Sequence, residues 1–322
     1  MSLDTPISQP APTDTAMTRP VPGLSRLAQD LLPVLYQHRL VATSQLHRLF
    51  TPHARRPVYL RQQLAKLRAA GLVDATTRRT SRLGRAELLW YITARGAGAV
   101  AHDPTIPRRG YRISPQTAAS QLQEHTLTVV DTGVAFVEWA RRLGHECSPL
   151  DWEPEIAHRI RDGETRGIND AFMIPDAVLR YTHTTTGGRR RMLSFFIEVD
   201  RATMQTTRLA AKLAAYARYQ HYVPHSGGRR SRATREAWRD HYPAFPRLLI
   251  VLTGASDRVL ANRIQDLRAL ATADQRVSLL TAGVTTLQLL QDKGPFAPVM
   301  TPLSGDTTPT DVFLTPSGGS RA

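Results

Sequence analysis

The chain has 322 residues and a formal net charge of +15. This length suits two domains of ordinary size, and the excess of cations indicates a polyanionic partner, most simply nucleic acid. The lone cysteine, Cys147, excludes an internal disulfide framework and a cysteine-rich zinc site. No apolar run approaches the length of about 20 residues that a membrane-spanning helix needs, so we expect a cytoplasmic protein without a membrane partner.

The first domain is predicted over residues 23–103, after a disordered lead over 1–22 that is rich in Pro, Thr and Ser. Apolar periodicity predicts helices over 23–39, 43–49 and 57–70, with Thr43 or Ser44 as a candidate N-cap. A basic segment and a strand over 88–92 follow and form a two-stranded ribbon. This order resembles a winged helix-turn-helix.

Basic and polar side chains on the third helix and the ribbon are the candidate contacts to double-stranded DNA. The comparable helix of a helix-turn-helix enters the major groove, where Arg and Gln read base edges. Ribbon arginines would contact phosphates or the minor groove. The alternative is a solvated basic face or a protein-contact surface. The candidates are Arg55, Arg56, Tyr59, Gln62, Gln63 and Lys66 on the helix, with Arg78, Arg79, Arg82 and Arg85 on the ribbon.

The second domain is predicted over residues 119–300, after a Pro-rich linker over 104–118. The pattern of apolar runs predicts an α/β domain with one mixed sheet. A disordered tail is expected over 301–322, where Thr, Pro, Gly and Ser dominate. The predicted elements of the second domain are helices over 120–143, 202–222 and 256–271, a hairpin that begins at Pro175, and strands over 247–253 and 277–280.

Carboxylates gather at one end of the predicted hairpin. Its first strand begins after Asp176, and its second strand ends with Glu198 and Asp200. In an antiparallel pair, the start of the first strand lies beside the end of the second, so the three carboxylates are expected to meet. Clustered carboxylates repel one another and usually need a cation. We therefore predict Asp176, Glu198 and Asp200 as ligands of Mg²⁺ or Mn²⁺.

The helix after the hairpin places Arg208, Lys212 and Tyr216 on one face, at i, i+4 and i+8. A Pro-Asp strand start, a Glu-x-Asp strand end and a helical lysine resemble a PD-(D/E)xK nuclease core. That resemblance implies that Asp176, Glu198, Asp200 and Lys212 are catalytic. It departs from the usual motif in one position, since Asp200 stands where a lysine is expected. Arg201, Arg208 and Tyr216 are predicted phosphate contacts, and His125 in the long helix is interpreted as structural.

Several segments together resemble the replication-relaxation family of bacterial plasmids and integrative elements. They are the amino-terminal winged-helix pattern, HTLTVVDTGVAFVEWARRLG, PDAVLRY, FFIEVDRATMQTTRLAAKLAAYARY and LLQDKGPFAPV, which span roughly residues 25–300. The resemblance implies a protein of plasmid or mobile-element replication and relaxation. Two hypotheses follow: a metal-dependent DNA nickase, or a non-catalytic winged-helix regulator or replication accessory protein with a degenerate nuclease-like domain. The oligomeric state is left open, with a homodimer as one candidate.

Overall fold

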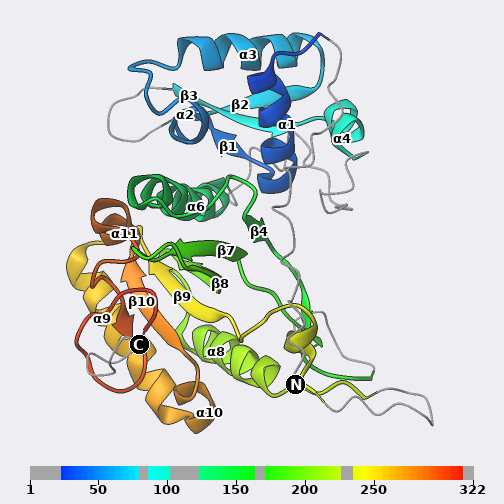
Figure 1. The fold of residues 1–322 in the computed structure, drawn as a ribbon. Helices are drawn as coiled ribbons and strands as arrows, with labels where there is room; N and C mark the ends of the chain where they lie inside the picture. The colour runs from blue at the N-terminus through cyan, green and yellow to red at the C-terminus, as the bar shows by residue number, and fades with distance from the viewer. Residues whose placement is uncertain (1–22, 80–85, 102–122, 164–170, 226–234, 315–322) are drawn as a thin grey trace, which may run out of the picture.

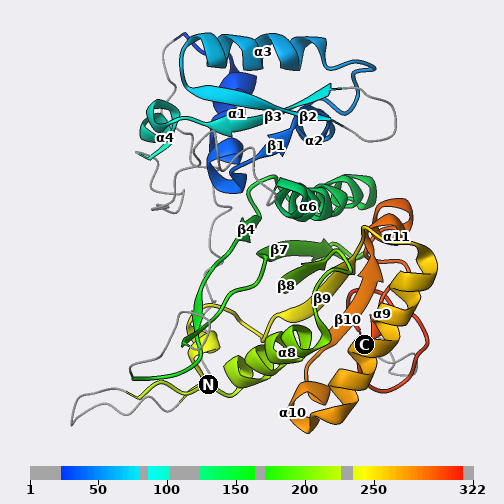
Figure 2. The same ribbon diagram turned by 180° about the vertical axis from the view of Figure 1, so that it is seen from behind.

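The computed structural model describes residues 23–79, 86–101, 123–163, 171–225 and 235–314. Two groups of elements are stacked, with helix α6 (Gln123–Leu143) between them (Figures 1 and 2). We call the elements before α6 the N-terminal module and those from α6 onward the α/β module. The predicted lead over 1–22, linker over 104–118 and last residues 315–322 lie outside the described residues. No helix in the described ranges is long and apolar enough to cross a bilayer.

The N-terminal module alternates helices with a small antiparallel sheet. Leu60, Leu64 and Leu67 are fully buried on one face of its third helix, as the apolar spacing predicts. The strand order in the sheet is β1-β3-β2, so the short first strand pairs with the second strand of the ribbon. The elements are α1 (Arg26–His38), β1 (Val41–Ala42), α2 (Thr43–Phe50), α3 (Val58–Ala69), β2 (Val73–Arg79), β3 (Ala86–Ile92) and α4 (Ala94–Val100).

The α/β module is built on a mixed six-stranded sheet in the order β11-β10-β9-β8-β7-β4. The pairs β8–β9 and β9–β10 are parallel, and the others are antiparallel. This confirms the predicted α/β class with a mixed sheet. The strands are β4 (Trp152–Pro154), β7 (Ala177–Thr184), β8 (Arg190–Asp200), β9 (Arg247–Leu252), β10 (Ala282–Thr286) and β11 (Thr301–Pro302), and a separate small hairpin contains β5 (His158–Arg159) and β6 (Phe172–Met173).

Helices cover both faces of this sheet. Helix α6 lies on the face toward the N-terminal module, and α8 (Thr206–Gln220), α9 (Asp257–Ala273) and α10 (Gln275–Ser278) lie on the other (Figure 1). The strand β8 is buried on both faces. Phe195 and Ile197 belong to the core that includes α6, whereas Phe196 belongs to the core beneath α8 and α9. This alternation follows from the two-residue period of a strand. The last helix is α11 (Leu287–Lys293), and a short 3-10 helix spans Ala237–Asp240.

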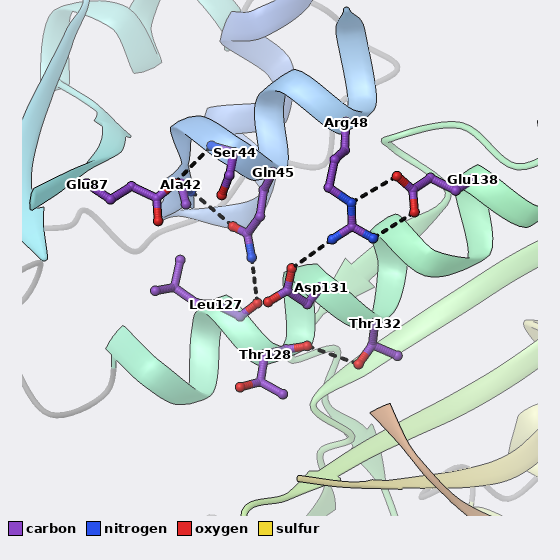
Figure 3. Close-up of polar contacts among 10 residues, drawn as sticks. All are labelled: Ala42, Ser44, Gln45, Arg48, Glu87, Leu127, Thr128, Asp131, Thr132 and Glu138. Atoms are coloured by element: carbon purple, nitrogen blue, oxygen red, sulfur yellow. Dashed lines mark hydrogen bonds and ion pairs between the residues drawn. The ribbon is translucent and has the colours of Figure 1, made fainter. Parts of the chain in front are cut away.

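The two modules meet mainly where α2 packs on α6 (Figure 3). Arg48 of α2 donates two hydrogen bonds to Glu138 of α6, at 2.9 and 2.6 Å, and pairs with Asp131 at 3.3 Å. Gln45 donates to the carbonyl of Leu127 at 2.8 Å. The leucines of α1–α3 belong to the same apolar core as α6 and the face of the sheet that α6 covers. A bidentate arginine pair over a shared apolar core joins the modules with defined geometry.

Three sequence predictions about elements are wrong. The expected strand over 277–280 is instead the last two residues of α10 and the turn after it; Asp274 caps that helix by accepting from the backbone N of Arg276. The true strand, β10, follows it. The expected disordered tail is packed up to residue 314: β11 pairs with β10, and Val312 is fully buried. The N-cap of α2 is Ala42, not Thr43 or Ser44, and its backbone N donates to the Gln45 side chain.

Candidate active site

The β7–β8 hairpin brings Asp176 beside Glu198. Ala177 pairs with Ile197 in the ladder, so the residue before β7 lies next to the residue after Ile197. The carboxylate of Asp176 also accepts a hydrogen bond from the backbone N of Val199 at 2.7 Å. This bond anchors Asp176 to the end of β8. The structure therefore bears out the predicted meeting of these two carboxylates.

Helix α8 brings a lysine and a tyrosine to Glu198. Lys212 donates to one carboxylate oxygen of Glu198, and Tyr216 donates to the other. The ammonium of Lys212 also lies 3.8 Å from Asp176 Oδ1. The spacing of four residues puts both donors on one face of α8, and that face is turned toward β8 because Leu209 and Leu213 are buried on it. Asp176, Glu198 and Lys212 thus converge, as the sequence predicted.

A fourth side chain, His125, reaches this cluster from the first turn of α6. Its Nε2 lies 3.2 Å from Asp176 Oδ1. The interpretation of His125 as merely structural overlooked this contact, because nothing in the sequence links residues 125 and 176. The one signal available was the coincidence of a histidine with the start of the helix that covers the carboxylate hairpin. His125 and Lys212 are the more exposed members of the cluster, so they mark its open side.

The two carboxylates titrate differently. Burial raises the pKa of Glu198 to about 7, and the neighbouring negative charge of Asp176 adds to the effect. Burial also disfavours ionisation of Asp176, but the hydrogen bond from His125 and the charge of Lys212 outweigh it and lower its pKa. The hydrogen bond to Asp176 raises the pKa of His125 against the effect of burial. Near neutral pH the site therefore holds one firmly ionised carboxylate and one that exchanges a proton.

Asp200 lines a cavity of about 20 Å³ together with Glu198 and Lys212, but its carboxylate is paired outside the cluster, which argues against the prediction that it is a catalytic residue and metal ligand. Its carboxylate accepts from Arg263 Nε of α9 at 2.7 Å, and both side chains are buried. The two-residue spacing puts Glu198 and Asp200 on the same face of β8, but α8 covers the first and α9 the second. Accordingly, the described part of the chain contains no group of three or more His, Cys, Asp or Glu side chains placed to hold a metal ion.

The three predicted phosphate contacts differ in how exposed their side chains are. Tyr216 is fully buried with its hydroxyl on Glu198, so it supports the carboxylate and does not face a phosphate. Burial and the charge of Glu198 raise its pKa well above the usual range for tyrosine. Arg208 is exposed one turn before Lys212 on α8, and Arg201 is half-buried just after β8. The charge of Arg208 acts on Lys212, whereas Arg201 lies beside Gly254.

The predicted DNA contacts of the N-terminal module are also only partly on its surface. Gln63 is a correction: it is 4% exposed and accepts a hydrogen bond from Ser25 at 2.7 Å. Arg78 forms an ion pair with Glu124 of α6 at 2.6 Å, so it contacts the other module. Arg79 ends β2, while Arg82 and Arg85 lie outside the described residues. Exposed candidates on or just before α3 are Arg55, Arg56, Tyr59, Gln62 and Lys66.

We expect the fold to lose about 2 kcal/mol between pH 5 and pH 7 through Glu198 alone. Its pKa of about 7 in the folded chain exceeds the ordinary 4.5, so the folded state holds the proton longer and stability falls as pH rises through this window. The raised pKa of His125 acts in the same direction above pH 6.5. In Glu198→Gln, the loss due to Glu198 should disappear. Urea unfolding at both pH values measures it, and an equal loss in both proteins would contradict the assignment.

Comparison with known proteins places the chain in a family but gives little more. No curated protein matches it. Restriction endonuclease FokI is structurally similar only at a TM-score of 0.26 and 10% identity, over 83% of this chain and 43% of that chain, so the chain spans less than half of FokI. A similarity this low carries no argument about fold or activity. The family model for replication-relaxation, in contrast, matches residues 32–229, which include the N-terminal helices, both carboxylates and Lys212. The chain belongs to the replication-relaxation family.

Proposed function

We propose that the protein binds double-stranded DNA through its N-terminal module and nicks it at the site formed by Asp176, Glu198 and Lys212, in the replication or relaxation of a plasmid or mobile element. The observation that carries the nicking proposal is that two carboxylates from one hairpin meet a lysine from the next helix. Membership of the replication-relaxation family supports a role on DNA.

The DNA-binding part of the proposal treats the N-terminal module as a winged helix-turn-helix. The element order from α1 to β3 and the strand order β1-β3-β2 support this assignment. Helix α3 would then enter the major groove with its exposed face, on which Tyr59 is 53% exposed and Lys66 is exposed. The other face of α3 is buried against the module core, so the helix can present one side to DNA.

The donor set fits a hard divalent cation. Mg²⁺ is commonly held by one or two carboxylates together with substrate phosphates, and Asp176 and Glu198 supply two. Both contact the same nitrogen, so their oxygens lie well within the separation of about 8 Å beyond which they could not share one ion. Burial and, after it, repulsion by Asp176 raise the pKa of Glu198, and a bound ion would relieve the repulsion. When bound, Mg²⁺ or Mn²⁺ would stabilise charge that builds on the phosphate.

The side chains around the carboxylates have separate tasks in this proposal. Tyr216 and the backbone of Val199 orient Glu198 and Asp176, each by a hydrogen bond. Lys212 stays protonated, since the charges of Glu198 and Asp176 raise its pKa against the effect of burial. A fixed ammonium at this point can stabilise the developing charge on a phosphodiester or position an attacking water.

Supercoiled plasmid provides the direct test of nicking. The purified protein should convert it to open circles with Mg²⁺ or Mn²⁺ and leave it supercoiled in EDTA. Glu198→Gln keeps the hydrogen bonds of the protonated carboxyl but cannot carry its charge, so this variant should bind DNA and not nick it. If every divalent ion leaves the plasmid intact while binding is retained, the nicking proposal is wrong.

One observation favours a second function, in which the protein binds DNA without cutting it. Lys212 and His125 already contact the carboxylate pair, so the cluster can be stable as a purely structural element. A regulator or replication accessory protein would bind its site through the N-terminal module alone. In that case Glu198→Gln should leave every DNA-dependent property unchanged, and a protein restricted to binding should show no metal dependence.

We expect Lys66→Ala to lower the slope of log affinity against log salt by about one, because one phosphate or groove contact is lost. Lys293→Ala is the matched control: that lysine is exposed at the end of α11, away from the N-terminal module, and the slope should stay unchanged. Fluorescence anisotropy at several salt concentrations measures the slopes. Equal slopes for Lys66→Ala and wild type would argue against α3 as the DNA-binding helix.

Gln63→Ala should instead lower thermal stability, since it leaves the Ser25 hydroxyl without its acceptor.

A further inference from the structure

The N-terminal module reaches the candidate active site through the end of α1. Gln37 donates to the carbonyls of Leu150 and Trp152, at 2.9 and 2.6 Å. His38 stacks on the Trp152 ring, with centroids 4.3 Å apart, and contacts the Pro149 carbonyl at 2.7 Å. These contacts hold the last turn of α1 against the segment that leads into β4. The residue after that turn, Arg39, is thereby fixed beside the α/β module.

Arg39 has an unusual backbone conformation. Its φ is 68° and its ψ is −52°, and the backbone N of Leu40 donates to the His38 carbonyl at 2.7 Å. This is a classic γ-turn, which is rare and strained. Its partner Glu155, 2.6 Å away, also has a positive φ of 56°. Non-glycine residues in such conformations are strained, and they cluster at functional sites.

A small cavity connects this ion pair to the catalytic carboxylate. It has a volume of about 30 Å³, and its lining includes Arg39, Glu155, His125 and Asp176. The backbone N of Glu155 donates to the carbonyl of Asp176 at 3.3 Å, so the pair is directly linked to the start of β7. Arg39 and His125 therefore place a guanidinium and an imidazole around one cavity beside Asp176, one from each module.

Solvent reaches the ion pair from one side. The side chain of Glu155 is 52% exposed, so water competes for its carboxylate, whereas that of Arg39 is 23% exposed. An arginine fork matches two phosphate oxygens as well as it matches a carboxylate, and it keeps its charge at every relevant pH. A phosphate can therefore take the place of the Glu155 carboxylate on the Arg39 guanidinium.

We propose that Arg39 binds a backbone phosphate of the DNA strand that enters the Asp176–Glu198–Lys212 site, by exchanging the Glu155 carboxylate for the phosphate. The N-terminal module then supplies one side of the substrate path in addition to α3. This inference rests on the proposed function, since it assigns part of the same substrate. It explains why a strained arginine at the end of α1 faces the α/β module.

The experiment compares Arg39→Asn with Glu155→Gln. Asparagine adopts a positive φ more readily than most non-glycine residues, so the first variant removes the charge with little added backbone strain. If Arg39 binds phosphate, Arg39→Asn should weaken binding of a plasmid-derived duplex several-fold and lower the salt slope by about one. Glu155→Gln releases Arg39, so its binding should equal or exceed that of wild type. Arg258→Asn, at an exposed arginine in the first turn of α9, is the matched control for loss of one charge.

The inference predicts that Arg39→Asn weakens DNA binding whereas Glu155→Gln does not, and this difference distinguishes it from a purely structural ion pair. If the pair only joins the modules, both variants lose the same interaction: both should lower the melting temperature alike and neither should weaken binding selectively. That result, or wild-type binding by Arg39→Asn, overturns the inference. A wild-type protein that binds the duplex without nicking it defeats the nicking proposal and leaves this comparison valid. A wild type that nicks, with an Arg39→Asn variant that binds and nicks equally well, defeats the Arg39 inference alone.

Discussion

Lys212→Met should reduce metal-dependent nicking by at least about 100-fold, which is the loss typical when one preorganised charge-stabilising donor is removed. Lys212 is the cation that contacts both Asp176 and Glu198, and methionine keeps most of its aliphatic length without the charge. The rate of open-circle formation from supercoiled plasmid at saturating Mg²⁺ or Mn²⁺ measures the effect. DNA affinity should change little, because binding is assigned to the N-terminal module.

The control for this variant must separate catalysis from folding. Without Lys212 the buried Glu198 loses its nearest cation, so it will hold its proton to higher pH and the fold should be assayed below pH 7. Arg218→Met removes an exposed cation from the last turn of the same helix and should nick at the wild-type rate. A folded Lys212→Met protein that still nicks normally would remove Lys212 from the mechanism and support the non-catalytic alternative.

The Asp176–Glu198 pair could be predicted from the sequence because its geometry depends on local rules. A hairpin register follows from the turn between its strands, and a helix face follows from a spacing of four residues. The first rule brings Asp176 and Glu198 together, and the second puts Lys212 and Tyr216 on the face of α8 that packs on the sheet. The same rules gave the wrong partner for Asp200, since its carboxylate accepts a hydrogen bond from Arg263, which lies 63 positions later on α9. A lone strand-end aspartate looks the same in sequence whether its partner is a metal ion or an arginine.

The contacts between the modules were equally invisible in the sequence. Arg48 on Glu138 and Arg39 on Glu155 join the two modules, and only the packing of α1, α2 and α6 brings these residues together. The contact of His125 with Asp176 inside the α/β module depends in the same way on the packing of α6. Periodicity identified these helices and their apolar faces, but it assigns no partner to a polar residue at the edge of such a face. The packed segment after residue 300 was missed for a related reason: its composition is typical of disorder, while a few apolar residues such as Val312 anchor it.

Asp200→Ala should lower the free energy of unfolding by about 3 kcal/mol or more, while nicking per folded molecule stays within a few-fold of wild type. The reason is that Arg263 would keep a buried charge without its carboxylate. Arg263 also donates to the Met204 carbonyl, so the connection between β8 and α8 should loosen as well. Asp257→Ala, in the exposed first turn of α9, is the matched control and should cost less than about 1 kcal/mol.

A double variant tests the cause of that destabilisation. Breaking one half of a buried ion pair is costly, whereas replacing both halves by apolar groups of similar size is often close to neutral. Asp200→Leu combined with Arg263→Met should therefore recover most of the stability that Asp200→Ala loses, as measured by urea unfolding. If Asp200→Ala instead unfolds like wild type and yet abolishes nicking, Asp200 acts on the metal or the substrate. The separation of Asp200 from the Asp176–Glu198–Lys212 cluster would then be the part of the site description to abandon.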